Sequence, residues 1–403
     1  MRFSNFDEIA QYLDEQGLFH MDLTLARVEA FARSFGPPGF LIAHVAGTNG
    51  KGSTAAFLER LSREHGVRTG LYTSPHFLNV RERVLVDGLA LDPEAWVEAA
   101  NEVHAFAGAE DLTYFEFLTC LAVSIFRRCG VQLAVMEAGL GGKYDAVRAF
   151  DANVSVLTHI GLDHMQVLGS TLAYIARDKA HVIRPGTPAF TAEQQAEVEE
   201  VLQARARSVG TELTVARPYA REVGMRGAHQ QANAGLALAA WSTLADELGV
   251  PRRVDREERA MQEAFIPGRL QYVREDGVTW MLDGAHNEPA LRALADAVDK
   301  EGVCPESMVV SCMRDKDLER MVPLLHDICA GRILCPSLPW YERMLPGQEL
   351  AEALGTNAEA CGTPEQAFQE AASGVGPVLI CGSLYLLAEF YKLYPEHLTR
   401  TMA

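Results

Sequence analysis

The feature that most constrains the fold of this chain is a glycine-rich turn between a short apolar run and an amphipathic stretch. Residues 40–46 are apolar enough for a buried strand, Gly47-Thr-Asn-Gly-Lys-Gly-Ser53 follows at once, and a helical pattern continues through Arg63. A turn of this kind exposes backbone N–H groups at a helix N-terminus, where a phosphate binds well. Lys51 adds a cation for β- and γ-phosphates. The sequence therefore predicts a strand–turn–helix unit that binds a nucleotide.

The turn departs from the strict P-loop pattern at two positions. Val45 stands where that pattern has its first glycine, and Gly52 follows the lysine where Ser or Thr is expected. A glycine turn with a purely structural role is the alternative. The flanking strand and helix, together with the lysine, favour phosphate binding.

Further short apolar runs alternate with longer amphipathic stretches. We expect strands at residues 67–72, 133–136, 154–157, 279–282, 307–311 and 378–381, and helices at 115–129, at 232–248 and after the last strand. A hairpin region is expected after Ile183. The β-α-β alternation predicts an α/β fold with parallel, doubly wound sheets.

The length of 403 residues suggests two or three domains. The segment Ile266-Pro-Gly-Arg269 interrupts the alternating pattern, which then begins again. We therefore expect a domain boundary near residues 267–277, with one domain over 1–272 and a second over 277–403.

The composition excludes some functions. The formal net charge of -18 argues against nonspecific nucleic-acid binding, which needs a basic face, although it permits anionic ligands such as ATP. The first residues carry acids where a signal peptide is basic, and no apolar stretch reaches 18 residues. Eight scattered cysteines include no Cys-x-x-Cys pair, so we expect reduced thiols, no zinc site and a cytoplasmic protein without membrane association.

A second motif, Met136-Glu-Ala-Gly-Leu-Gly-Gly142, follows a buried apolar strand. Glu137 ends that strand, and ligands of α/β proteins bind at the carboxyl ends of sheet strands. Magnesium takes oxygen ligands and needs few from the protein when phosphates supply others. Glu137 is therefore the best magnesium ligand in the sequence; the alternative is a solvated acid at a strand end.

A third motif, His159-Ile-Gly-Leu-Asp-His164, also follows a strand, which should place its histidine near Glu137. Lys179 lies on a helix just beyond, in Arg177-Asp-Lys-Ala180. A lysine beside a magnesium ion conflicts with charge repulsion unless its charge is changed, and carbamylation by CO₂ would give an anionic oxygen ligand. The residues alone favour this idea only weakly, because a lone histidine is more often structural.

A fourth group consists of Asn233, Arg269 and the segment Leu282-Asp-Gly-Ala-His-Asn287. Asn233 opens the expected alanine-rich helix and is either a ligand contact, a helix cap or a core amide. Arg269 lies in the expected boundary and would reach a phosphate from there. Asp283 ends the first strand of the second expected domain. Each signal is weak when taken alone.

Together these motifs resemble the folylpolyglutamate synthase and dihydrofolate synthase family, a branch of the Mur ligases. The resemblance runs through most of the chain, and the order and spacing of the segments make chance matching implausible. The matching segments are Phe19–Leu23, Gly47–Ser53, Thr73–His76 with Glu82 and Arg83, Thr113–Glu116, Glu137–Gly142, Leu162–His164, Asp178–Ala180, Pro267–Arg269, Asp283–Asn287, Asp315–Asp317 and Gly382–Tyr385.

The resemblance implies a two-domain Mur-ligase architecture, with a P-loop-type ATPase domain and a Rossmann-like C-terminal domain. It implies ATP contacts from Thr48, Asn49, Gly50, Lys51, Gly52, Ser53, Asn233, Arg269 and Asp283. It implies two magnesium ions with ligands at Ser74, Glu137 and His164, and a carbamylated Lys179. It implies an acid-substrate pocket lined by Thr113, Tyr114, Phe115, Glu116, Tyr144, Asp145, Ala146 and Ser383.

One segment departs from the family pattern. Where the family usually has Arg-Leu-Asp-Ala-Thr-Asn, this chain has Lys143-Tyr-Asp-Ala-Val-Arg148. Asp145 is kept, but Val147 and Arg148 replace a polar pair. The hypothesis is that the two residues alter the choice of acid substrate, with Arg148 reaching a substrate carboxylate; the alternative is that both side chains point away from the pocket.

The activity implied by the resemblance is ATP-dependent ligation of L-glutamate to dihydropteroate, to reduced folates, or to both. The acid would be activated as an acyl phosphate, with Lys51 and two magnesium ions offsetting charge. His286 lies near the transferring phosphate or the incoming amino acid, or it has a structural role. A Mur-type ligase for another acid and a non-catalytic nucleotide-binding regulator are the alternatives. The protein is expected to be a monomer.

Overall fold

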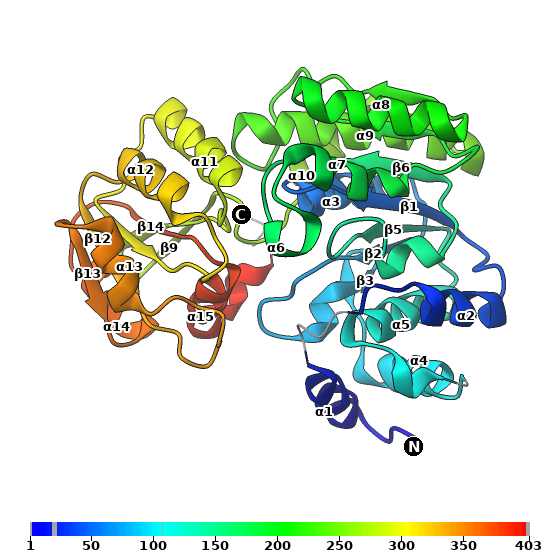
Figure 1. The fold of residues 1–403 in the computed structure, drawn as a ribbon, viewed down its shortest axis with the longest axis horizontal. Helices are drawn as coiled ribbons and strands as arrows, with labels where there is room; N and C mark the ends of the chain where they lie inside the picture. The colour runs from blue at the N-terminus through cyan, green and yellow to red at the C-terminus, as the bar shows by residue number, and fades with distance from the viewer. Residues whose placement is uncertain (1, 18–21, 107, 400–403) are drawn as a thin grey trace. The chain divides into compact units, whose positions relative to one another are not determined.

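The computed structural model describes residues 2–17, 22–106 and 108–399, and within them the chain forms two compact units (Figure 1). Unit 1 comprises Met1–Ile160, Thr171–Glu222 and Ala232–Ala264, and unit 2 comprises Gly161–Ser170, Val223–Gln231 and Phe265–Ala403. The main division thus falls at 264/265, and two short upstream segments belong to unit 2. Of the motif Phe19–Leu23, residues 19–21 lie outside the described residues.

Unit 1 is built on an eight-stranded sheet in the order β4-β3-β2-β5-β1-β6-β7-β8. The run from β2 to β8 is parallel, and β3 and β4 extend it as antiparallel strands. The strands are β1 (Leu41–Ala46), β2 (Thr69–Tyr72), β3 (Val84–Val86), β4 (Leu89–Ala90), β5 (Leu133–Glu137), β6 (Val154–Leu157), β7 (Ala189–Thr191) and β8 (Leu213–Val215). The central strands are buried on both faces, as a parallel sheet covered by helices requires.

Helices cover both faces of this sheet. The connection from β1 to β2 and the connection from β2 to β5 run in opposite directions along the sheet, so right-handed crossovers place their helices on opposite faces. The helices are α1 (Phe6–Gln16), α2 (Ala26–Phe35), α3 (Lys51–Glu64), α4 (Pro93–His104), α5 (Tyr114–Arg128), α7 (Leu172–Lys179), α8 (Ala196–Val209), α9 (Ala228–Leu248) and α10 (Val254–Glu263). Short 3₁₀ helices are η1 (Val80–Arg83), η2 (Ala109–Asp111), η3 (Ala146–Ala149) and η4 (Ala180–Val182).

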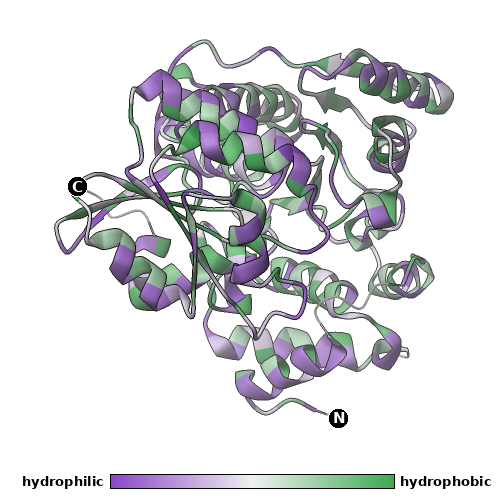
Figure 2. Ribbon diagram, turned by 60° about the vertical axis from the view of Figure 1, so that its left-hand side comes forward, coloured by the Kyte–Doolittle hydropathy of each residue, from purple (hydrophilic) through white to green (hydrophobic). Residues whose placement is uncertain are grey.

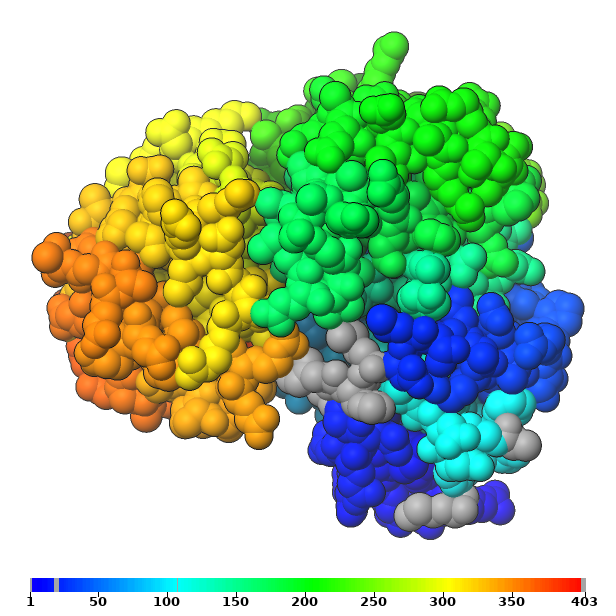
Figure 3. Space-filling model, viewed as in Figure 1, coloured from blue at the N-terminus to red at the C-terminus, as the bar shows by residue number. Residues whose placement is uncertain are grey.

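Packing among these helices follows their apolar faces. Helix α3 lies against α10, and the rings of His65 and Trp241 bring α9 to the same face. On the other side, α1 packs on α4 and α5, and the N-terminal helices lie beside the segment of α4 in the space-filling view (Figure 3). Apolar and polar residues alternate around the helices, as expected of helices with one face on a sheet (Figure 2).

Unit 2 contains a six-stranded sheet in the order β13-β12-β11-β14-β10-β9, parallel except for β9. Its strands are β9 (Gln271–Glu275), β10 (Val278–Leu282), β11 (Ser307–Val310), β12 (Arg332–Pro336), β13 (Ala358–Cys361) and β14 (Val378–Cys381). Its helices are α6 (Met165–Leu168), α11 (Glu288–Glu301), α12 (Leu318–Ile328), α13 (Gly347–Leu354), α14 (Pro364–Ala372), α15 (Leu384–Leu393) and η5 (Pro395–Leu398). The α/β fold with largely parallel sheets is thus confirmed in both units.

Two expectations about local structure are wrong. The region after Ile183 is not a hairpin, because α8 connects β7 to β8 and both strands run parallel to β6. Val198, Leu202 and Ala206 are the buried residues of α8, and their spacing of four is the helical signal that was overlooked. Asn233 does not open its helix, because α9 begins five residues earlier, at Ala228.

No helix in the described part of the chain combines the length and apolar character that crossing a bilayer requires.

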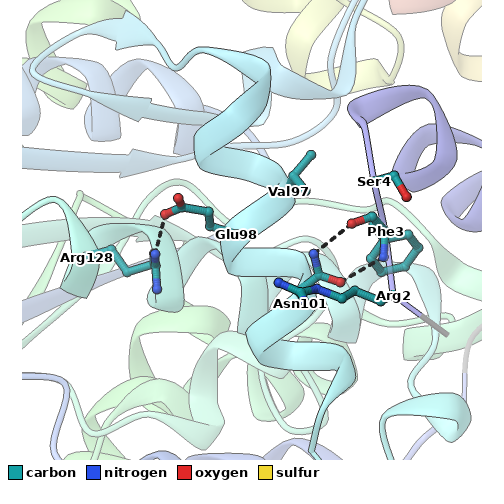
Figure 4. A pocket seen from close by; sticks show the side chains of 7 residues that line it. All are labelled: Arg2, Phe3, Ser4, Val97, Glu98, Asn101 and Arg128. Carbon is teal, nitrogen blue, oxygen red and sulfur yellow. Dashed lines mark hydrogen bonds and ion pairs between the residues drawn. The ribbon is translucent and has the colours of Figure 1, made fainter.

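A small pocket lies where the N-terminal segment meets α4 (Figure 4). The backbone N–H of Phe3 donates to Oδ1 of Asn101 at 2.8 Å, and Nδ2 of Asn101 donates to the Phe3 carbonyl at 2.9 Å. Glu98 and Arg128 form an ion pair at its rim. These contacts hold the N-terminal segment in place, and none of the residues belongs to a chemical motif of the sequence.

Candidate active site

The glycine turn of unit 1 has the conformation and the close neighbours that require glycine. Gly50 has φ +87° and precedes the first residue of α3, while Gly47 has φ +149°. A Cβ on Gly47 would lie 1.9 Å from Oγ1 of Thr158, and one on Gly50 would lie 2.4 Å from Oδ1 of Asn233. The structure therefore brings the buried amide of Asn233 against the turn, although it lies within α9 and not at its start.

The backbone of the turn is anchored to the segment after β6. The N–H groups of Thr48 and Asn49 both donate to the carbonyl oxygen of His159, at 2.9 and 3.2 Å. The first N–H groups of α3, on Lys51, Gly52 and Ser53, have no acceptor within the helix because no turn precedes them. These three groups are the ones that the helix N-terminus offers to a phosphate.

Two lysines and a carboxylate converge on this turn. Nζ of Lys51 lies 3.3 Å from the Thr48 carbonyl oxygen and 4.0 Å from Oε1 of Glu137. Nζ of Lys179, at the end of α7, donates to the Gly47 carbonyl at 2.8 Å. Oε2 of Glu137 accepts from the backbone N–H of Ser74 at 3.3 Å. The expected neighbours Lys51, Ser74, Glu137 and Lys179 are therefore assembled in unit 1.

The donors around Glu137 fit magnesium. Glu137 is 4% exposed and ends β5, and the Ser74 segment adds a hydroxyl close by, so the set consists of hard oxygen donors. Among the described residues, the only group of three His, Cys, Asp or Glu side chains close enough to share an ion is Glu275, Glu396 and His397. No such group among the described residues includes Glu137. An ion held at Glu137 would take further oxygen ligands from phosphate and water.

Aromatic side chains from α5 adjoin the glycine loop after β5. A Cβ on Gly139 would lie 2.7 Å from the ring of Phe115, so the ring presses directly on that loop. The rings of Phe115 and Tyr72 lie 5.7 Å apart. The segment expected to bind the acid substrate is thus placed beside the loop that carries Glu137.

Two polar residues of the same segment are used within the protein. Thr113 and Glu116 form a capping box at the start of α5, in which Oε2 of Glu116 accepts from the Thr113 N–H at 2.8 Å. The Glu116 carboxylate also pairs with the guanidinium of Arg27, at 3.0 Å. These contacts show Thr113 and Glu116 shaping the start of the helix.

Asp145 is a buried carboxylate within the departing segment. Its Oδ2 accepts from the Leu140 N–H at 2.9 Å, and its Oδ1 accepts from the Val147 N–H at 3.1 Å. Burial raises the pKa of Asp145 to about 6, although these hydrogen bonds and the charge of Lys179 act in the opposite direction. Ala146 is buried beside it, while Tyr144 is partly exposed with Nζ of Lys143 4.6 Å from its ring centre.

Val147 and Arg148 have structural partners. Val147 is fully buried. Nε of Arg148 donates to the His181 carbonyl at 3.1 Å, and its Nη1 donates to the Lys143 carbonyl at 3.2 Å. These contacts favour the alternative in which both side chains hold the loop together, over a direct contact of Arg148 with substrate.

In unit 2, Asp283 ends β10 with its oxygens occupied. Oδ2 accepts from the Leu270 N–H at 2.7 Å, and Oδ1 accepts from the Ala285 N–H at 2.8 Å. Burial raises the pKa of Asp283, while the nearby guanidinium of Arg269 lowers it. A Cβ on Gly284 would lie 2.4 Å from Nη1 of Arg269, so the structure does bring Arg269 and Asp283 together.

Asp163 is the centre of a second cluster in unit 2. Its Oδ1 pairs with Nζ of Lys316 at 2.5 Å, and its Oδ2 accepts from Nδ2 of Asn287 at 2.8 Å. Nε2 of His286 lies 3.7 Å from Oδ2, and Nε2 of His164 lies 3.9 Å from it. These donors hold the pKa of Asp163 well below its usual range despite burial. The role of Asp163 was not foreseen, although its motif was.

The remaining histidine and serine have defined partners in unit 2. Nδ1 of His286 lies 2.7 Å from the Gly284 carbonyl oxygen and must donate, because a carbonyl oxygen only accepts. Oγ of Ser383 accepts from the Tyr385 N–H at 3.1 Å and caps α15, with the side chain buried. Ser383 is therefore a helix cap in this structure.

Comparison with protein families gives two matches. Residues 45–184 match the Mur ligase middle domain, and residues 268–384 match the Mur ligase glutamate ligase domain. The first match contains the glycine turn, Glu137 and Lys179, and the second contains Arg269, Asp283 and Lys316. The cluster around Asp163 draws on both matches, because Asp163 and His164 lie in the first and its partners Asn287 and Lys316 lie in the second.

Curated relatives match over most of the chain. It is 30% identical to the dihydrofolate synthase/folylpolyglutamate synthase of Bacillus subtilis, over 97% of this chain and 99% of that protein. It is 34% identical to a putative folylpolyglutamate synthase of Caenorhabditis elegans, over 73% of this chain. The chain spans 64% of the length of the Caenorhabditis elegans relative and 66% of that of a folylpolyglutamate synthase from Arabidopsis thaliana.

Solved structures share the fold. FolC of E. coli in complex with DHPP and ADP superposes with a TM-score of 0.87 at 28% identity, over 98% of this chain and 99% of that one. A bifunctional folylpolyglutamate synthase/dihydrofolate synthase with Mn, AMPPNP and L-glutamate bound gives a TM-score of 0.85 at 29% identity, over 97% and 98% of the two chains. By its sequence and its two-domain architecture, the chain belongs to the folylpolyglutamate synthase and dihydrofolate synthase family of Mur ligases.

Proposed function

We propose that the protein is an ATP- and magnesium-dependent amide ligase that joins L-glutamate to dihydropteroate, to folate glutamates, or to both. The observation that carries the proposal is the convergence of Lys51, Glu137 and Lys179 on the glycine turn. A turn that only shaped the fold would need neither lysine. Relatives described as folylpolyglutamate synthases, and a related structure that binds ADP and DHPP, support the choice of substrates.

The first step is phosphoryl transfer to the acid. An oxygen of the substrate carboxylate attacks the γ-phosphorus of ATP, the bond to the β–γ bridging oxygen breaks, and an acyl phosphate and ADP result. Lys51 lies at the N-terminus of α3, where its charge and the N–H groups of Gly52 and Ser53 stabilise the charge that develops on the phosphates. Asn233, which touches the turn, is proposed as a further ATP contact.

Metal binding is assigned to oxygen donors in unit 1 and to an imidazole in unit 2. Ser74 and Glu137 are the proposed ligands in unit 1, and His164 is the proposed ligand in unit 2. When bound, magnesium draws charge from the phosphate oxygens that it contacts. We propose two ions, and the Mn reported in a related structure supports a divalent metal.

Lys179 is proposed to be carbamylated. Its amine would add to CO₂, lose a proton and become an anionic carbamate able to bind a metal. The support is its position: the side chain is 4% exposed and reaches the glycine turn, where a bare ammonium beside a divalent cation is unfavourable. Lys179→Ala should lose activity, and added formate should restore part of it. Unmodified lysine in a high-resolution structure grown with bicarbonate and magnesium would contradict the modification.

The second step forms the amide. The amine of glutamate attacks the acyl carbon, a proton leaves the nitrogen, and the phosphate departs as the tetrahedral intermediate collapses. In unit 2, Arg269 and Asp283 are proposed to contact the nucleotide. His286 has its ring oriented by the Gly284 carbonyl and Asp163, and we propose that it lies near the transferring phosphate.

An ADP-release assay tests the proposal. The assay is run with ATP and magnesium, and with dihydropteroate, tetrahydrofolate or neither, each with and without L-glutamate. ADP release that requires both an acid and glutamate is the expected result. Release with nucleotide alone, or no release with any acid, would reject the ligase assignment for these substrates.

A further inference from the structure

Arg83 is a largely buried cation that no carboxylate of the described residues neutralises. It ends η1, immediately before β3, and the residue is 4% exposed. Its Nε donates to Nδ1 of His76 at 2.8 Å, and its guanidinium carbon lies 5.3 Å from the ring centre of Tyr114. Among the described residues, no carboxylate forms an ion pair with Arg83, and neither terminal nitrogen has a hydrogen-bond partner.

The neighbouring groups do not supply the missing charge. The adjacent Glu82 directs its oxygens to the backbone N–H groups of Phe77, Leu78 and Asn79. His76 accepts from Arg83 through Nδ1, and an imidazole carries no negative charge that could neutralise the guanidinium. The terminal nitrogens of Arg83 are not among the buried polar atoms that lack a partner in the described residues, so they reach solvent and are open to a partner from outside the chain.

The surroundings of Arg83 indicate where that partner lies. The backbone N–H of Thr73, just after β2, donates to the Arg83 carbonyl at 3.0 Å, and the guanidinium lies over the ring of Tyr114, the first residue of α5. The ring of Tyr72 adjoins that of Phe115, and Phe115 presses on the loop at Gly139. Arg83 therefore lies beside a group of rings, here called the aromatic wall, next to the loop that follows Glu137. The aromatic wall consists of Tyr72, Tyr114 and Phe115.

We propose that Arg83 is a substrate-binding residue that pairs with the carboxylate of the aromatic acid substrate. The inference rests on the proposed ligase function and adds the residue that recognises the acid. A planar guanidinium with two unpaired terminal nitrogens matches the two oxygens of a carboxylate. Phosphates are the less suitable partner for Arg83, because Lys51 and the N-terminal N–H groups of α3 already offer a phosphate site on the glycine turn.

Arg81 provides a matched control on the same 3₁₀ helix. It lies two residues before Arg83, its Nη1 donates to the Leu91 carbonyl at 3.3 Å, and its guanidinium carbon lies 5.4 Å from the ring centre of Phe6. Among the described residues, Nε of Arg81 is fully buried and has no hydrogen-bond partner. None of the nitrogens of Arg83 is both fully buried and without a partner. Replacing Arg81 therefore removes an arginine from η1 without touching the aromatic wall.

Binding in the absence of ATP and metal isolates the contribution of Arg83. The probes are pteroate and its carboxamide, which lacks the negative charge, measured by calorimetry in EDTA with the full-length protein. The wild type should bind pteroate about 10- to 100-fold more tightly than the amide, as a charge-assisted pair implies. Arg83→Gln should reduce that preference to within about twofold by weakening pteroate alone, and Arg81→Gln should keep it.

Thermal unfolding separates recognition from structure. Arg83→Met removes a charge that has no acidic partner, so without ligand its melting temperature should equal or exceed that of the wild type. Added pteroate should no longer raise the melting temperature of this variant. Equal weakening of both probes in Arg83→Gln, or an unchanged preference, overturns the assignment. A purely structural role would lower the melting temperature of both Arg83→Met and Arg83→Gln. It would also leave the preference for pteroate over the carboxamide intact in both Arg83→Lys and Arg83→Gln. That combination of results also overturns the assignment.

The proposed function fails in a different way. If the wild type binds neither probe and releases no ADP with any pteroate or folate, the ligase assignment is rejected, and the role of Arg83 with it. If the wild type discriminates between the probes and Arg83→Gln does so equally, only the role of Arg83 is rejected.

Discussion

The two units place charged groups at the carboxyl ends of parallel strands, but they satisfy those groups in opposite ways. In unit 1, the ammonium groups of Lys51 and Lys179 contact backbone carbonyl oxygens. In unit 2, the oxygens of Asp283 and Asp163 are filled by donors from the protein, including Lys316. Lys51 begins α3 and its side chain is 18% exposed, whereas the side chains of Asp163 and Lys316 are each 5% exposed.

The comparison separates groups placed for ligands from groups placed for the fold. A buried polar group whose partners come from the protein stabilises or orients its surroundings. A charged group with few protein partners is costly until a ligand arrives, and sites that bind ligands carry that cost. Substitutions of Asp163 or Lys316 should therefore change stability first, and substitutions around the glycine turn should change activity first.

The largest expected effect is on the stability of unit 2. Asp163→Asn should lower its stability by about 3–5 kcal/mol, because it leaves the charge of Lys316 buried without its partner. Adding Lys316→Met should recover a substantial part of the loss. Thermal unfolding measures both, with Glu98→Gln of the exposed Glu98–Arg128 pair as a control that should change little. A stable Asp163→Asn protein would break the contrast between the units.

Next in size is the effect of Glu137→Gln on turnover. The amide keeps an acceptor for the Ser74 N–H but loses the negative charge, so the melting temperature should hold. The kcat of ADP release should fall about 10²- to 10³-fold, or ~3–4 kcal/mol, as when one electrostatic contact to a transition state is lost. Near-normal kcat at saturating magnesium would show that Glu137 is not a metal ligand.

Asp145 gives an intermediate, pH-dependent effect. Its pKa is raised from 3.8 to about 6 in the fold, so the folded state binds the proton more tightly than the unfolded chain. Stability from this group is present in full below pH 4 and is lost as pH rises through 6, by ~3 kcal/mol. Melting temperatures across pH 4–7 should therefore fall less steeply in Asp145→Asn than in the wild type. Parallel curves would mean that the carboxylate is ionised throughout.

The smallest catalytic effect is expected for the departing pair. Because Arg148 binds two backbone carbonyls and Val147 is buried, Val147→Thr with Arg148→Asn should cost about 1–2 kcal/mol of stability. The KM values for dihydropteroate, tetrahydrofolate and ATP should each stay within about twofold of the wild type, ~0.4 kcal/mol. A larger change in the KM of an acid, with that of ATP unchanged, would support the hypothesis that the pair selects the substrate.

Elements with a strong local signal were predicted closely. The expected strand at residues 154–157 and the one at 378–381 coincide with β6 and β14, and α3 ends one residue beyond the expected limit, at Glu64. Helix α3 directly follows the glycine turn, β14 is an unbroken apolar run, and β6 is apolar except for Ser155, so neighbouring residues alone predict these segments. The prediction for the region after Ile183 is wrong because β7 and β8 are only three residues long, and because the four-residue spacing of the buried residues in α8 indicates a helix between them.

The candidate site was predicted in part. Lys51, Ser74, Glu137 and Lys179 were expected together and are together. The enclosed network around Asp163 was not expected, because its partners Asn287 and Lys316 lie more than a hundred residues away in the sequence. The unneutralised charge of Arg83 could not be foreseen either, since an arginine beside Glu82 looks paired until the structure shows where Glu82 points.

The sequence by itself determined the strand–turn–helix unit, the parallel α/β class and the family motifs, because short-range patterning and residue identity are local properties. Only the tertiary structure decided the order of the strands, the assignment of residues 161–170 to unit 2 and the partners of each buried charge. Burial and pairing depend on contacts between distant segments, and these contacts set the desolvation and hydrogen bonding of Arg83, Asp145 and Asp163. For that reason sequence motifs identify the candidate residues, while tertiary contacts determine which of their polar groups already have partners in the protein and which are open to a ligand.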